Sequence, residues 1–113
     1  MQTDSTDLID RLVAAYNRCD ARAFADCFEE NVSVFEHPGT PAQQTREEIF
    51  QYYRQLFDQY PQNRTEILHR ITIGNRIIDH ERVRRHPESE AFEVLAIYDL
   101  GERLIKRLDF IRS

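Results

Sequence analysis

The stretch RTEILHRITIGNRIIDHERVRRHPESEAFEVLAIYDLGERLIKRLDFIR, residues 64–112, decides the fold. Apolar and polar residues alternate along it, and this period of two is typical of strands that bury one face. Three turn sequences interrupt the alternation: Gly74-Asn75, Pro87-Glu88-Ser89 and Gly101-Glu102. They separate four predicted strands, at residues 64–73, 76–86, 91–100 and 103–112. Because the connections are short, we expect an antiparallel meander.

The residues before this stretch begin with helical spacing. Apolar side chains recur at helical intervals over residues 7–19, which predicts an amphipathic helix. Asp20 is placed to cap a second, shorter helix that ends at Asn31. Residues 32–37 are β-branched and aromatic and precede the breaker Pro38-Gly39, so we predict a strand there.

A third helix has the clearest boundaries. Thr45 and Glu48 have the spacing of a capping box, and apolar residues follow at helical intervals to Tyr60, just before Pro61. Helices in the first half and strands in the second define an α+β class. A chain of 113 residues matches one domain, which we expect to span residues 1–113.

Composition excludes several classes of protein. The net charge of -5 disfavours nucleic-acid binding, and no apolar run approaches the ~20 residues of a membrane span. The N-terminal residues lack the pattern of a secretion signal, so we expect a cytoplasmic protein. Cys19 and Cys27 are then expected as buried thiols rather than a disulfide. No Cys/His spacing predicts a metal site.

The order of the predicted elements is similar to that of the nuclear-transport-factor-two-like superfamily. The segments that carry the resemblance are LVAAYNRCDARAFADCFEENVSVFEHPG, QTREEIFQYYRQLF, IIDHERV and FEVLAIYDLGERLIKRLDFIR. SnoaL-like polyketide cyclases, ketosteroid isomerases and limonene-type epoxide hydrolases belong to this superfamily. The resemblance implies a cystatin-like cone, in which three N-terminal helices pack on a curved, mainly antiparallel sheet. It also implies a closed-ended pocket and a homodimer formed through the outer face of the sheet.

Alternation leaves two choices of inward face for each strand. In strand 91–100 we place Phe92, Val94, Ala96 and Tyr98 inside. In strand 76–86, composition does not decide between the face of His80 and Arg82 and the face of Ile77, Asp79, Glu81 and Val83. The resemblance to epoxide hydrolases, which carry an inward Arg on this strand, selects the face with Arg82.

The same resemblance aligns Asp109 with an inward carboxylate of the last strand. Asp109 lies between Leu108 and Phe110, and a carboxylate buried there needs a partner, for which Arg82 is the candidate. Such a pair fits a structural role or a water-activating base, and the sequence leaves both open. The aligned proton donor is Arg84, which cannot act as an acid, so His80 would have to donate.

Resemblance to ketosteroid isomerases aligns Glu36 with their catalytic base. The two aligned hydrogen-bond donors are Leu12 and Val94, which cannot donate, and this argues against that mechanism. Tyr16 lies one helical turn after Leu12 and is an alternative donor, or it packs with its hydroxyl in water.

Two function classes follow. The first is a cofactor-free isomerase, cyclase or hydrolase acting on a small lipophilic substrate; the second is a non-catalytic ligand-binding or dimerisation module. The predicted catalytic residues are Glu36, His80, Arg82 and Asp109. The predicted ligand-binding residues are Tyr16, Phe35, Tyr53, Phe57, Val94 and Tyr98. We expect no cofactor, no metal, no nucleic acid and no membrane partner.

Overall fold

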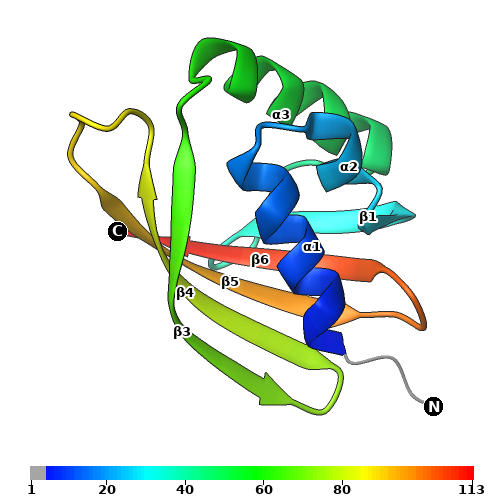
Figure 1. The fold of residues 1–113 in the computed structure, drawn as a ribbon. Helices are drawn as coiled ribbons and strands as arrows, with labels where there is room; N and C mark the ends of the chain where they lie inside the picture. The colour runs from blue at the N-terminus through cyan, green and yellow to red at the C-terminus, as the bar shows by residue number, and fades with distance from the viewer. Residues whose placement is uncertain (1–4) are drawn as a thin grey trace.

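Three helices precede a four-strand meander in the computed structural model, which describes residues 5–113 (Figure 1). The helices are α1 (Ser5–Asn17), α2 (Ala21–Ala25) and α3 (Arg46–Gln59). The strands are β1 (Phe28–Glu36), β2 (Thr40–Pro41), β3 (Arg64–Ile73), β4 (Arg76–Arg84), β5 (Phe92–Leu100) and β6 (Ile105–Arg112). The predicted α+β class and the four-strand meander are therefore confirmed.

All the strands described form one sheet in the order β2-β1-β6-β5-β4-β3. The meander strands pair antiparallel, whereas β1 pairs parallel with β6, with Phe35 opposite Asp109. This parallel pair joins the first strand in sequence to the last. The first and last long strands are therefore hydrogen-bonded neighbours within the sheet.

The second helix is shorter than predicted. Asp20 caps α2 as expected, because its Oδ1 accepts a hydrogen bond of 3.0 Å from the Ala23 amide. The helix ends at Ala25, and the predicted helical residue Phe28 already begins β1. Phe24 and Phe28 are four residues apart, which is a helical spacing, but they lie in different elements. Phe28 has no exposed surface, and the two side chains are buried in the same core.

The third helix begins and ends where the sequence predicted. Thr45 caps α3 by accepting a hydrogen bond of 3.0 Å from the Glu48 amide. The Glu48 carboxylate accepts from the amide of Gln44 at 2.7 Å, one residue before the position that a capping box requires. Tyr60 caps the other end, immediately before Pro61.

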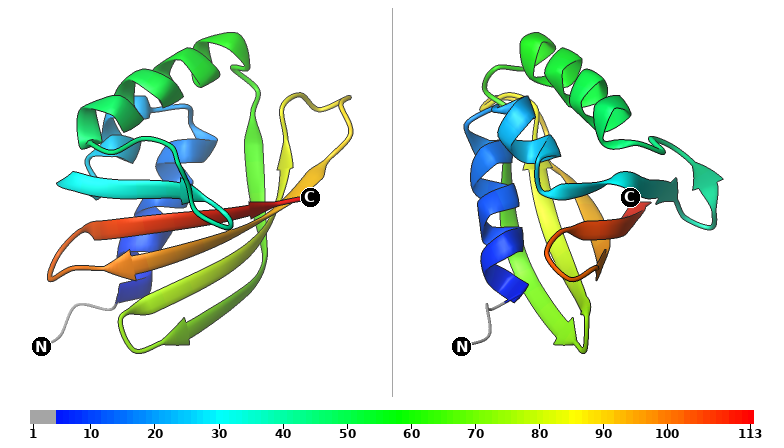
Figure 2. Two further views of the ribbon diagram at one scale, coloured as in Figure 1. Left: turned by 180° about the vertical axis from the view of Figure 1, so that it is seen from behind. Right: turned by 90° about the vertical axis from the view of Figure 1, so that its right-hand side faces the viewer.

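The sheet curves around α1, which lies across its inner face, and α3 lies beyond its upper edge (Figure 2). A two-residue turn joins β3 to β4, and Gly74 adopts a positive φ of 58° there, which favours glycine. A bulge between Ile67 and His69 shifts the register of β3 against β4. After the bulge, Arg70 faces inward and His69 outward.

None of the helices in the described part of the chain is long and apolar enough to cross a membrane.

Candidate functional site

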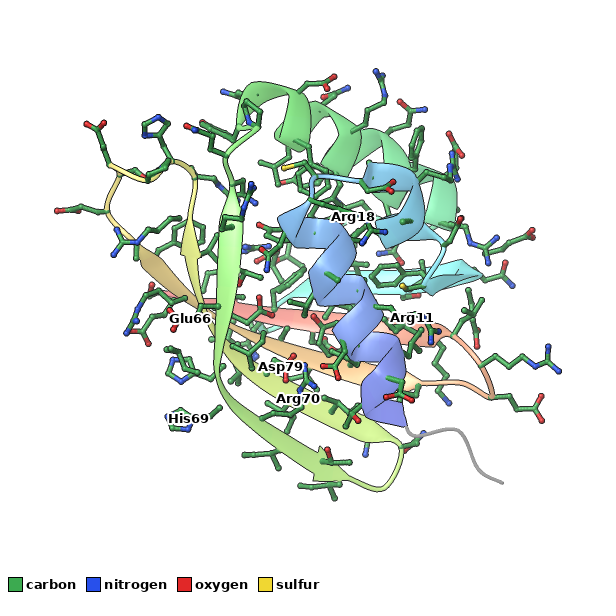
Figure 3. The ribbon with its side chains drawn as sticks, viewed as in Figure 1. Arg11, Arg18, Glu66, His69, Arg70 and Asp79 are labelled. Atoms are coloured by element: carbon green, nitrogen blue, oxygen red, sulfur yellow. The ribbon has the colours of Figure 1, made fainter. Side chains whose placement is uncertain are left out.

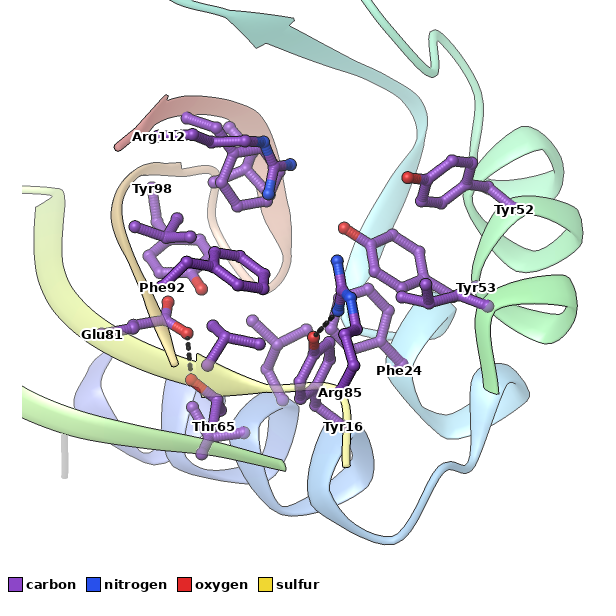
Figure 4. Close-up of a pocket in the computed structure, with 17 residues that line it drawn as sticks. Tyr16, Phe24, Tyr52, Tyr53, Thr65, Glu81, Arg85, Phe92, Tyr98 and Arg112 are labelled. Carbon is purple, nitrogen blue, oxygen red and sulfur yellow. Dashed lines mark hydrogen bonds between the residues drawn. The ribbon is translucent and has the colours of Figure 1, made fainter. Parts of the chain in front are cut away.

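A small hollow opens between the helices and the inner face of the sheet (Figure 4). Its walls come from α1, α2, α3 and strands β3 to β6, and most of the lining side chains are apolar or aromatic. Its cavity volume is about 40 Å³, which is room for a few atoms. A larger ligand would have to displace side chains at the mouth, where Tyr52 is 47% exposed.

Glu81 on β4 is the buried carboxylate of this hollow. The residue is 8% exposed, and its Oε1 accepts a hydrogen bond of 2.8 Å from the Thr65 hydroxyl. Burial raises the pKa of Glu81 to about 7, and the negative charge of Asp79 adds to the rise. The Thr65 hydrogen bond and the charges of Arg112 and Arg70 act in the opposite direction. Glu81 is therefore a carboxylate that exchanges its proton near neutral pH.

An ion pair lies beside Glu81 on the same inner face. Asp79 has no exposed surface, and Arg70 binds both of its carboxylate oxygens, at 2.6 and 2.9 Å. Arg70 also reaches Asp10 on α1, at 2.6 Å. The hydrogen bond to Asp79 raises the pKa of Arg70. Arg70 thus connects Asp79 on the sheet to Asp10 on α1, and Figure 3 shows Arg70 beside Asp79.

Tyr16 on α1 supplies a hydroxyl to the opposite wall. Arg85 Nη1 donates to this hydroxyl at 3.2 Å and to Asn63 Oδ1 at 2.9 Å. Burial raises the pKa of Tyr16, while Asn63 and Arg85 lower it in part. The Nδ2 atom of the fully buried Asn63 nevertheless forms no hydrogen bond of ordinary geometry within the described part of the chain. Since the Tyr16 oxygen already accepts from Arg85, its own proton is available to a ligand.

Two further tyrosines line the hollow. Tyr53 and Tyr98 are 6% and 3% exposed, and their hydroxyls form no hydrogen bond with another residue in the part of the chain described. Burial raises the pKa of both hydroxyls, and for Tyr98 the nearby charge of Glu81 raises it further. Both tyrosines therefore stay protonated and are neutral donors.

Arg112 at the end of β6 also lines the hollow. It binds both carboxylate oxygens of Glu36, at 2.9 and 3.0 Å. Burial lowers the pKa of Arg112, but the hydrogen bond to Glu36 and the coulombic interactions with Tyr53, Glu36 and Tyr52 together raise it overall. Glu36, one of the predicted catalytic residues, is accordingly the counter-ion of Arg112 beside the hollow.

The predicted orientation of β4 is wrong. Ile77, Asp79, Glu81 and Val83 are the buried face of this strand, and His80 and Arg82 lie on the other. His80 pairs with Glu93 at 2.6 Å and stacks on His69, with 5.7 Å between ring centroids. Arg82 pairs with the exposed Glu66 at 3.4 Å. In Figure 3, Glu66 and His69 lie on the opposite side of β3 from Arg70.

The expected pair between Asp109 and Arg82 is absent. Asp109 binds Arg107 on its own strand, at 2.9 and 3.1 Å. The buried neighbours Leu108 and Phe110 point inward, so alternation turns Asp109 to the outer face. Phe35 lies opposite Asp109 in the strand register, and the guanidinium carbon of Arg107 lies 4.3 Å from the centroid of the Phe35 ring. The predicted place of Phe35 in the pocket is therefore also wrong.

The other predicted ligand-binding residues divide into two groups. Tyr16, Tyr53, Val94 and Tyr98 line the hollow. Phe57 does not line it: it is buried in the aromatic core, 5.4 Å from the Tyr16 ring. Their roles toward a ligand stay predictions.

Sequence reasoning missed Glu81, Thr65 and Arg85. The pairing of β4 with β5 would have located Glu81. Glu81 lies opposite Val94, which was correctly predicted on the inner face, so Glu81 lies on that face too. Cys19 and Cys27 are free thiols, but only Cys27 is buried as expected, whereas Cys19 is half-buried. Burial raises the pKa of Cys27. No group of three or more His, Cys, Asp or Glu side chains within residues 5–113 is arranged to hold a metal ion.

The fold is therefore an α+β cone with helices on a curved, mostly antiparallel sheet, and its candidate site is a small hollow with one buried carboxylate. The family model for the SnoaL-like domain matches residues 9–108. The chain belongs to the SnoaL-like family.

Solved structures show the same fold. An uncharacterized cystatin-fold protein from Novosphingobium aromaticivorans aligns with a TM-score of 0.90 at 23% identity, over 98% of this chain and 100% of that one. A protein from Sinorhizobium meliloti, provisionally named a polyketide cyclase, aligns with a TM-score of 0.76 at 19% identity, over 96% and 99%. A protein from Kribbella flavida, provisionally named a ketosteroid isomerase, gives 0.79 at 12% identity, over 96% and 77%. No protein with a curated function matches.

Proposed function

We propose that the protein is a cofactor-free enzyme that moves a proton at a carbon next to a carbonyl group of a small lipophilic substrate. Glu81 is the base, and Tyr16 donates a hydrogen bond to the enolate oxygen that forms. The observation that carries the proposal is a carboxylate with a pKa of about 7 in the same hollow as tyrosine hydroxyls that have no hydrogen-bond acceptor among the described residues. The proposed base is therefore Glu81, in place of Glu36 and Asp109.

The position of Glu81 suits a general base. A base is most effective when its pKa lies near the working pH, and burial brings Glu81 there. Only one of its oxygens accepts a hydrogen bond from within the described chain, from Thr65. The other oxygen is left for the proton of a substrate.

Two tyrosine donors, Tyr16 and Tyr53, face Glu81 from the other side of the hollow. Figure 4 shows Glu81 and Tyr98 on the sheet and Tyr16 and Tyr53 on the helices around one space. The hydrogen bond from Arg85 polarises the Tyr16 hydroxyl and makes its proton a better donor. In the reaction, Glu81 takes a proton from the α-carbon, Tyr16 stabilises the enolate oxygen, and Glu81 returns the proton to carbon.

The walls define the substrate class. Leu12, Phe24, Val83, Phe92 and Val94 line the hollow and favour an apolar body. The names of two similar structures, a polyketide cyclase and a ketosteroid isomerase, agree with chemistry through an enolate. The likeness to these two proteins is one of fold, so the reaction is proposed from Glu81 and Tyr16.

Hydrogen exchange at carbon tests the reaction without knowledge of the natural substrate. The probe is 2-tetralone in D2O, and loss of its α-proton signal is followed by NMR. We expect the wild-type protein to accelerate exchange above the buffer rate, with a rate that rises with pH through about 7 as Glu81 ionises. Tyr16→Phe should lower the rate by about 100-fold or more.

The matched controls are two glutamate substitutions. Glu81→Gln should remove the acceleration, while Glu66→Gln, which alters an exposed glutamate that pairs with Arg82, should leave it unchanged. If wild-type protein and Glu81→Gln exchange the probe at the same rate, Glu81 is not a base and the proposal fails.

The small cavity favours the second function class, a non-catalytic ligand-binding or dimerisation module. A volume of about 40 Å³ is far below the ~300 Å³ of an ordinary ligand pocket. In that case 2-tetralone would bind or fail to bind with no exchange above buffer. The exchange measurement therefore separates the two classes.

We also propose the homodimer that the resemblance implies. Exposed apolar residues on β3 and β6 include Ile71, Ile73 and Ile111, which are 53%, 65% and 38% exposed. Contact between two outer faces would cover such side chains. Light scattering of the purified protein should give twice the monomer mass, and a monomer at micromolar concentration would contradict the proposal.

A further inference from the structure

Arg85 is a positive charge on the wall of the hollow that no carboxylate of residues 5–113 neutralises. It follows the last residue of β4 and is half-buried. Its Nη1 atom makes both of its hydrogen bonds, to Tyr16 and to Asn63. Both of these acceptors are neutral. No Asp or Glu among residues 5–113 lies within ion-pair distance of its guanidinium.

The other half-buried arginines have acidic partners. Arg46, Arg70 and Arg85 are the arginines of intermediate exposure in the described chain. Arg46 lies 4.0 Å from Glu30, and Arg70 binds Asp79 and Asp10. Burial of a cation is costly without a compensating charge, so the exception at Arg85 indicates a partner from outside the chain.

Glu81 does not act as that partner. The charges that shift the Glu81 pKa are those of Asp79, Arg112 and Arg70. Arg112 in turn is bound by Glu36. Arg85 is thus the cation of the hollow that remains uncommitted.

Aromatic rings hold the Arg85 guanidinium in place. Its central carbon lies 4.9 Å from the ring centroid of Phe92 and 5.8 Å from that of Tyr60. With Nη1 fixed by Tyr16 and Asn63, the Nε and Nη2 donors are free of protein partners in residues 5–113. A planar fork with free donors beside an aromatic ring matches a planar carboxylate joined to an apolar body.

We infer that Arg85 is an anion-binding subsite and that the substrate is a lipophilic carboxylate. The acid group of the substrate binds the guanidinium, and its apolar body lies against Phe92 and the walls of the hollow. The inference deepens the proposed function by naming its substrate class, and it rests on that function for the reaction although not for the binding.

Two probes of the same shape test the subsite: 2-naphthoate, an anion, and 2-naphthamide, which is neutral. Dissociation constants are measured by calorimetry at pH 6 and low salt, where an ordinary carboxylic acid is ionised and Glu81 is largely protonated. We expect wild-type protein to bind 2-naphthoate at least about 10-fold more tightly than 2-naphthamide. Added salt should reduce this preference.

Substitutions assign the preference to one residue. Arg85→Gln should bring the ratio of the two dissociation constants to about 1. Arg84→Gln removes the same charge from the neighbouring exposed arginine, which donates only to the Ser89 carbonyl oxygen, and should retain the ratio. A wild-type ratio near 1 overturns the inference without any variant, as does an unchanged ratio in folded Arg85→Gln.

The two proposals fail separately. A preference for 2-naphthoate that depends on Arg85, together with no exchange of 2-tetralone, would leave the subsite standing and refute the reaction. Exchange that depends on Glu81, with equal binding of both naphthalene probes, would refute the subsite alone.

Discussion

Replacing Glu81 by glutamine should stabilise the protein at alkaline pH. Glu81 is 8% exposed, and its pKa rises from the ordinary 4.5 to about 7 in the folded chain. Because the folded state holds the proton of Glu81 more tightly than the unfolded state, the contribution of Glu81 to stability is fully present below about pH 4.5 and is lost as the pH rises through about 7. Glutamine has the same shape but carries no charge, so Glu81→Gln avoids this loss.

The shift sets the size of the effect. A rise of the pKa from 4.5 to about 7 corresponds to about 3 kcal/mol in the free energy of unfolding. At pH 8.5 we therefore expect Glu81→Gln to be more stable than wild type by up to about 3 kcal/mol, and at pH 4.5 to be nearly equal to it. The glutamine carbonyl oxygen can still accept the hydrogen bond from Thr65, so the comparison isolates the charge.

Urea unfolding at a series of pH values between 4.5 and 8.5 measures the difference. Glu66→Gln is the control, since the Glu66 side chain is 67% exposed and its substitution should change stability by about 1 kcal/mol or less. A difference between Glu81→Gln and wild type that is the same at pH 4.5 and pH 8.5 would refute the reasoning.

The remaining predictions concern the neighbours of Glu81. Thr65→Val removes a hydrogen bond that lowers the Glu81 pKa, so the pH profile of 2-tetralone exchange should move to higher pH. Asp79→Asn removes a negative charge that raises this pKa, so the profile should move to lower pH. Arg70→Met leaves Asp79 buried without a partner and should lower the free energy of unfolding by about 3–5 kcal/mol. Asp10→Ala, at the exposed end of the same network, should cost about 1 kcal/mol or less in urea unfolding.

Local signals were sufficient to predict most elements of the fold. Turn residues such as Gly74 fix where strands end, and the Thr45 cap and Pro61 bound the third helix, because these effects act over a few residues. The boundary between α2 and β1 was missed because Phe28 is buried under either assignment. Its conformation is decided by pairing with Ile105, far along the chain.

The site was harder to predict because the faces of β4 are alike in composition. Each face carries charged and apolar residues, and the choice depends on partners from other elements. Asp79 is buried because Arg70 binds it, and Arg70 faces inward only after a bulge in β3. No signal in the sequence predicts this bulge. Glu81 is buried beside Thr65 for a similar reason. On β6, however, alternation with the inward Leu108 and Phe110 is enough to place Asp109 on the outer face. Strict alternation would therefore have corrected the inward position of Asp109 that the resemblance implied.

The proposed reaction depends most on the protonation of Glu81 in the folded protein. The direct measurement is a titration of its side-chain carboxyl carbon by NMR in glutamate-labelled protein, with the signal assigned by its loss in Glu81→Gln. We predict a midpoint near pH 7 for Glu81, while the exposed Glu66 serves as the solvent-exposed reference in the same spectra. A Glu81 midpoint near pH 4.5 would contradict the buried base and, with it, the proposed reaction.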